Sequence, residues 1–159
     1  MNLSLNFTLE SFTRSTTAAA KGIDNSLPES LLPNAIATAE MLERIRTLLS
    51  ERAGYTVPIL LTSGYRCMAL NLALGSSSTS DHPRAQAGDW TAPSYGTPAQ
   101  ICRVLAPLIS TLGIGQLIYE CPTADRRWVH TSTRVPAQSA NRVITIGPGR
   151  RVLLGIQDV

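Results

Sequence analysis

The longest regular pattern in the sequence is a run with helical spacing between residues 33 and 52. Its apolar side chains recur every three or four positions, which places them on one face of a helix. Gly54 follows directly and is typical of a helix end. The apolar positions are Ile36, Met41, Leu42, Ile45, Leu48 and Leu49. We therefore predict one long amphipathic helix, against which the rest of the chain must pack.

The remaining regular runs are short. Two further helices are predicted, over CMALNLALG and over PAQICRVLAPLISTLG, where Pro107 interrupts the pattern. Apolar runs bounded by turn residues predict strands at VPILLTSGY, near 87–90, at GQLIYE, at RWVHTS, and in the tail at RVITI and RVLLGI, which GPGR joins as a hairpin. This order predicts an α+β fold with a small, largely antiparallel sheet flanked by helices.

The length of 159 residues suits a single domain. At the start, Thr8 is placed to cap a short helix, and a polar stretch with Gly22, Asn25 and Pro28 follows it. We therefore expect residues 1–28 to form an N-terminal arm on a main domain over residues 29–159.

The composition argues against several classes of protein. With 43% hydrophobic and 16% charged residues the chain is globular rather than disordered. The net charge is +3, but the arginines are scattered and aromatic residues make up only 5%, so no nucleic-acid partner is expected. Neither a signal peptide nor a membrane-inserted segment is predicted, which implies synthesis in the cytoplasm. Three cysteines without C-x-x-C spacing are expected to be reduced thiols.

The chain contains only two histidines, His82 and His130. His82 ends a serine-rich loop seven residues before Asp89, and His130 lies in an apolar strand. Two imidazoles and one carboxylate make a ligand set that suits a catalytic zinc with an open fourth position. From the residues alone, the alternative that both histidines are merely solvated or hydrogen-bonded stays open.

Three motifs resemble the peptidase M15 family of zinc peptidases, in particular its phage-type group. They are S-G-Y-R at 63–66, S-x-H followed by A-x-D over 80–89, and W-x-H at 128–130, and FTLESFTRSTTAAAKGIDNSLP resembles the amino-terminal segment of that group. The resemblance implies an M15/hedgehog-like fold in which His82, Asp89 and His130 hold Zn²⁺. It also implies that Arg66 faces the scissile bond and that Ser80 shapes the loop.

A zinc peptidase needs a general base that takes a proton from water and passes it to the leaving amine. Some relatives have a glutamate three residues before the last histidine, but Arg127 stands there in this chain. We therefore predict Glu120 as the base, with Asp125 as the second candidate in what we expect to be a long loop. Arg66 is the second predicted catalytic residue, because its guanidinium can stabilise negative charge. Its alternative role is to cap a helix or to pair with Asp81.

Two residues depart from the family pattern. Ala85 stands where glycine is usual, and an alanine would be strained there by about 1 kcal/mol if the backbone needs positive φ. Trp90 replaces a smaller residue and is predicted either to pack behind the metal or to line the substrate groove. The predicted substrate-binding residues are Arg66, Ser80, Trp90 and Trp128.

The resemblance implies hydrolysis of an amide bond in the peptide stem of bacterial peptidoglycan, by an endopeptidase or a carboxypeptidase. We expect a phage lysis enzyme released by a separate membrane-perforating protein (a holin), or a virion component that acts from outside. The alternative is a catalytically weak or inactive virion protein that keeps the fold and binds cell wall. Arg127 and Ala85 favour that alternative.

Overall fold

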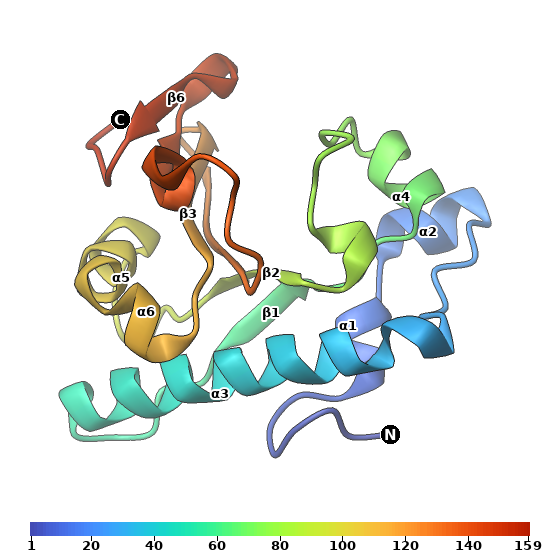
Figure 1. Ribbon diagram of the computed structural model, residues 1–159, viewed down its shortest axis with the longest axis horizontal. Coiled ribbons are helices and arrows are strands. Elements are labelled where there is room, and N and C mark those ends of the chain that lie inside the picture. The colour runs from blue at the N-terminus through green and yellow to red at the C-terminus, as the bar shows by residue number, and fades with distance from the viewer.

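The computed structural model describes residues 1–159 and shows a six-stranded sheet with its long helix and the helices after residue 97 packed on one face (Figure 1). The strand order is β1-β2-β4-β3-β5-β6. All neighbouring strands are antiparallel except β3 and β5, which are parallel. The strands are β1 (Leu60–Ser63), β2 (Ala87–Thr91), β3 (Gln116–Thr123), β4 (Arg126–Ser132), β5 (Val143–Ile146) and β6 (Val152–Leu154). The α+β prediction is confirmed, and the sheet is mixed.

The helices follow the predicted pattern, except that a further helix forms over Thr16–Lys21, capped by Ser15, in the polar stretch that was expected to be a loop. The long one is α3 (Leu32–Ala53), which ends at Gly54 with φ 76°. The proline at 107 separates α5 from α6 through a short 3₁₀ turn, η3 (Ala106–Leu108), as predicted. The others are α1 (Leu9–Thr13), α2 (Thr16–Lys21), α4 (Met68–Ala73), α5 (Pro98–Leu105) and α6 (Ile109–Leu112), with 3₁₀ turns η1 (Glu29–Leu31), η2 (His82–Arg84), η4 (Ser139–Arg142) and η5 (Pro148–Arg150). None of these helices combines the length and apolar character needed to cross a membrane.

The hydrophobic core lies between α3, α5 and one face of the sheet. Alternate residues of the strands point into it, including Trp90, Leu117 and Val129. Gly88 also faces this side, because a Cβ there would meet the Leu42 side chain of α3. The three cysteines are free thiols, as expected.

The amino-terminal segment shares the same core. Phe7 and Phe12 are buried, and Thr8 caps α1 as predicted, in a reciprocal pair of hydrogen bonds with Ser11. The carbonyl oxygen of Phe12 accepts a hydrogen bond from the Tyr65 amide at 2.8 Å. The segment is therefore held directly against the S-G-Y-R loop, while the division at residue 28 stays a prediction.

One predicted loop proved wrong. Residues 121–127 were expected to form a long loop, but β3 and β4 run through them as a hairpin that turns at 124–125. Thr123 pairs with Arg126 across this turn. The antiparallel pair continues to the tip with a shift of register between Glu120 and Thr123, so that Asp125 lies away from the middle of the sheet.

Candidate functional site

The site lies on the face of the sheet opposite the core. Strand pairing sets Asp89 beside His130 and His130 beside Ile118, so these residues form one row across β2, β4 and β3. In the next row Trp128 pairs with Glu120. Because side chains alternate along a strand, all of these residues share one face. The topology thus brings together the predicted metal ligands and the predicted base.

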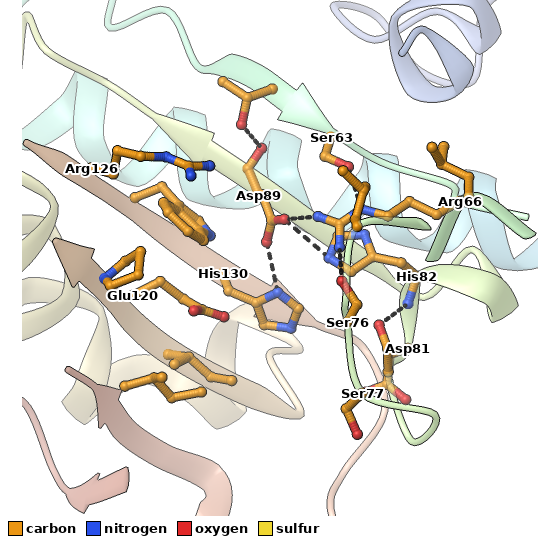
Figure 2. Close-up of a pocket in the computed structure, with 18 of the residues that line it drawn as sticks. Ser63, Arg66, Ser76, Ser77, Asp81, His82, Asp89, Glu120, Arg126 and His130 are labelled. Carbon is orange, nitrogen blue, oxygen red and sulfur yellow. Dashed lines mark hydrogen bonds and ion pairs between the residues drawn. The ribbon is translucent and has the colours of Figure 1, made fainter. Parts of the chain in front are cut away.

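The three predicted metal ligands meet at one point (Figure 2). His82 Nε2 lies 3.2 Å from Asp89 Oδ2, and His130 Nδ1 lies 2.8 Å from Asp89 Oδ1. Their candidate ligand atoms all lie within 4.8 Å of one another, and all three residues are buried. This cluster could hold a metal ion.

The hydrogen bonding of His82 tests whether this donor set fits a cation. His82 Nδ1 donates to the Gly64 carbonyl at 2.6 Å, since a carbonyl oxygen can only accept. Burial lowers the pKa of His82, which favours the neutral ring. The lone pair of Nε2 then faces the carboxylate of Asp89, and two acceptors at this distance repel unless a cation lies between them. The set therefore fits a divalent metal.

Gly64 is required by packing rather than by backbone conformation. A Cβ at this position would lie 2.6 Å from the Phe12 carbonyl oxygen. The glycine lets α1 approach the loop closely, and the loop carbonyl in turn orients His82. The amino-terminal segment therefore supports the metal cluster through a single intervening residue.

Arg66 lies in the same cavity and contacts Asp89 through Nη2. Its Nε donates to Ser63 Oγ at 2.8 Å and its Nη1 to Ser76 Oγ at 3.3 Å. The alternative pairing with Asp81 is not found. The guanidinium is thus fixed beside the cluster. Burial disfavours ionisation of Asp89, but the hydrogen bond and the positive charge of His130 outweigh it and hold its pKa well below the usual range.

Asp81 instead ties the His82 loop to β4. Its carboxylate accepts hydrogen bonds from Ser132 Oγ at 2.8 Å and from Arg134 Nη1 at 2.7 Å. The predicted loop residue Ser80 lines the cavity, and its Oγ accepts from the His82 amide at 3.4 Å. Sequence reasoning missed the Asp81 anchor, because Arg134 is 53 residues away along the chain.

Glu120 lines the cavity, and its carboxylate lies on the same side of the sheet as His130 (Figure 2). Burial raises the pKa of Glu120 above its ordinary value. A carboxyl group with a raised pKa is suited to holding a proton during catalysis. Asp125 does not line the cavity, so only one of the two candidate bases is in reach of the cluster.

The two tryptophans have different positions. Trp128 lines the cavity, whereas Trp90 is fully buried on the core face and donates from Nε1 to Thr131 Oγ1. Of the two positions predicted for Trp90, the place in the substrate groove is wrong, because the alternation that points Asp89 outward points its neighbour inward. Trp90 is therefore not available to a substrate.

Ala85 has the left-handed backbone that was considered from the sequence. Its φ is 55° and its ψ is 28°, and its carbonyl accepts a hydrogen bond from Thr38 Oγ1 at 2.9 Å. A non-glycine residue in this region costs about 1 kcal/mol. The turn therefore carries strain directly after His82.

The cavity has a volume of about 850 Å³ and extends beyond the cluster. Sequence reasoning missed the wall supplied by the carboxyl-terminal hairpin, namely Ile144, Ile146, Arg150 and Val152, and missed Arg126 at the end of β4. The alternation of RVITI could have indicated one lining face, but not that β5 would lie beside β3.

Comparison with protein families gives a match to peptidase M15 over residues 5–131. The chain belongs to the peptidase M15 family. The matched region contains the whole His-Asp-His cluster together with Arg66 and Glu120. The hairpin that forms one wall of the M15 cavity lies outside it. No curated protein matches the chain.

Proposed function

We propose that this M15 peptidase is a zinc enzyme that hydrolyses an amide bond in the peptide stem of bacterial peptidoglycan. The observation that carries the proposal is the apposition of His82 Nε2 and Asp89 Oδ2 at 3.2 Å in a buried cluster, with the Glu120 side chain in the same cavity. An inactive wall-binding protein would have no need of an acid there. That observation therefore favours an enzyme over the inactive alternative.

In this proposal His82, Asp89 and His130 would hold the zinc ion. When bound, zinc acidifies water and polarises a peptide carbonyl group. The burial of the three ligands excludes bulk solvent, which strengthens electrostatic interactions at the reacting bond. Gly64 fixes the tautomer of His82 that leaves Nε2 free to coordinate.

Glu120 accepts the proton of the attacking water on its carboxylate and delivers it to the leaving amine. Its raised pKa helps it to retain the proton between these two steps. Arg66 is held by Ser63 and Ser76, so its guanidinium is oriented before substrate arrives. It stabilises the negative charge that develops on the carbonyl oxygen of the substrate.

The substrate and the biological setting follow from the family resemblance. A stem peptide offers several amide bonds and free carboxylates, and arginine side chains bind carboxylates well. We place the activity in phage lysis or in a virion that opens the wall from outside.

The test measures bound zinc and the release of amino groups from purified cell wall. We expect about one zinc per chain, loss of zinc and activity in His82→Ala, and retained zinc with lost activity in Glu120→Gln. The control is Glu40→Gln, which neutralises an exposed glutamate on α3 and should change neither quantity. Undiminished turnover by Glu120→Gln would contradict its role as the base, and absence of activity in zinc-loaded wild type would contradict the proposed function.

A further inference from the structure

The cavity contains more positive charge than its acidic residues balance. Asp89 is paired with Arg66, and Asp81 is paired with Arg134. Three other arginines line the same cavity and form no ion pair: Arg14, Arg126 and Arg150. Glu120 is the only acid left to offset them, and it too has no ion pair.

Arg126 and Arg150 lie further along the sheet than the two rows of site residues already described. The first row contains Asp89 and His130, and the second contains Glu120 and Trp128. Arg126 comes two residues before Trp128 on β4, with its guanidinium carbon 5.8 Å from the centre of the Trp128 ring. Arg150 belongs to η5, which follows the strand whose residue Ile146 pairs with Glu120. A cationic third row therefore lies beyond Glu120.

The backbone at Arg150 is strained. Its φ is 61°, in the left-handed region that favours glycine, and its Nη2 donates to the Gly75 carbonyl at 2.6 Å. This bond joins the carboxyl-terminal hairpin to the segment after α4, because Gly75 lies between Leu74 and Ser76, which both line the cavity. Gly149 also has positive φ, so the turn between β5 and β6 sets this backbone, and the turn directs the Arg150 side chain towards the cavity that it lines.

We propose that Arg126 and Arg150 form a subsite that binds a carboxylate of the substrate, so that the enzyme selects acidic peptides. The inference rests on the proposed function and specifies its substrate class. Four residues separate His130 from Arg126, which is about 13 Å along an extended strand. The recognised carboxylate therefore lies about four residues of extended peptide from the bond that is cut.

The experiment measures peptide binding by calorimetry in zinc-loaded Glu120→Gln protein, in which turnover is not expected. The probe is the synthetic stem peptide Ala-D-Glu-Lys-D-Ala-D-Ala, used with both carboxyl groups free, with the glutamate carboxyl amidated, or with the terminal carboxyl amidated. We expect one of the amidated forms to bind about tenfold more weakly than the free peptide. That form identifies the recognised carboxylate.

Arg126→Gln and Arg150→Gln, each added to this protein, should weaken binding of the free peptide about tenfold and leave binding of the identified amidated form unchanged. Arg52→Gln on α3 removes an exposed arginine outside the cavity and should change neither affinity. Arg150→Gly should also abolish the preference for the carboxylate, because it removes the guanidinium while glycine readily adopts the left-handed backbone.

Three results would overturn the subsite: equal binding of the free and both amidated peptides, equal weakening of free and amidated forms by the two substitutions, or an equal effect of Arg52→Gln. Carboxylate-dependent binding that both substitutions abolish would support the subsite even if the wild type releases no amines from cell wall. That combination would contradict the peptidase proposal alone.

Discussion

At the scale of single residues, the site depends on close contacts that leave no space for an added side-chain atom. Gly64 joins two of them, because its carbonyl orients His82 and its missing side chain admits Phe12. Both contacts involve backbone atoms of the loop. A change at this one position therefore acts on stability and on the metal cluster together.

Gly64→Ala should lower the free energy of unfolding by roughly 2–3 kcal/mol, because its Cβ would overlap the Phe12 carbonyl. It should also weaken zinc binding, since the Gly64 carbonyl must move. Chemical denaturation and zinc titration measure the two effects. Gly147→Ala, whose Cβ would make only ordinary contacts, is the control. Wild-type zinc affinity in Gly64→Ala would show that the loop does not orient His82.

Glu120 should make stability depend on pH. Its pKa is raised by burial in the folded protein, so its ionised form destabilises the fold; this cost is absent below about pH 4.5 and complete above the folded-state pKa. In chelator-treated protein, Glu120→Gln should therefore be more stable than wild type at neutral pH and equal to it near pH 4. Denaturation at both pH values measures this, with Glu40→Gln as the control. A gain of the same size at both values would contradict the raised pKa.

At the scale of elements, the amino-terminal segment is clamped to the S-G-Y-R loop by Asn25. Its Nδ2 donates to the carbonyls of Thr13 and Tyr65, and its Oδ1 accepts from the Cys67 amide. These bonds fix the backbone on both sides of Arg66. The sequence indicated only a polar loop at this position, because hydrogen bonds to backbone atoms 40 residues away leave no local pattern.

Asn25→Ala should cost about 2 kcal/mol of stability, because it leaves buried backbone groups without partners. It should also lower the catalytic rate by displacing Arg66. Thermal denaturation and cell-wall hydrolysis measure these effects. Lys21→Ala, which removes an exposed side chain of the same segment, should change neither. Loss of stability with an unchanged rate would show that the clamp does not position Arg66.

Much of the fold and the cluster could be predicted from sequence. Helical spacing located α3, and alternation located β4, because local burial patterns determine both. His82, Asp89 and His130 carry recognisable motifs and were brought together as expected. Trp90 was misplaced because its side depends on strand register. Arg126 was missed because residues 121–127 were expected to be a loop, and Arg150 because its position depends on the pairing of β5 with β3, which no short motif encodes.

At the scale of the whole molecule, metal binding should be coupled to stability. The ligands come from η2, β2 and β4, so a bound ion links parts of the chain that are 48 residues apart at the extremes. The unfolded chain offers no such arrangement. Binding to the folded state alone therefore raises the free energy of unfolding.

Zinc at a hundredfold excess over its dissociation constant should stabilise the protein by about 2.7 kcal/mol. Thermal unfolding with zinc and with a chelator measures the difference. His82→Ala should abolish it, whereas Cys67→Ala, which removes a partly exposed thiol outside the cluster, should retain it. A zinc-dependent rise that survives His82→Ala would indicate binding elsewhere.

The alternation of side chains along β2 makes the protein sensitive to the register of this strand. Asp89 points into the cavity and Trp90, the next residue, points into the hydrophobic core. A slip of one residue between β2 and β4 would exchange them, burying an anion in an apolar environment while expelling an indole. Both changes would lower the stability of the mispaired fold. Loops tolerate insertions and deletions. A one-residue insertion or deletion within β2 would instead disrupt both the hydrophobic core and the metal cluster.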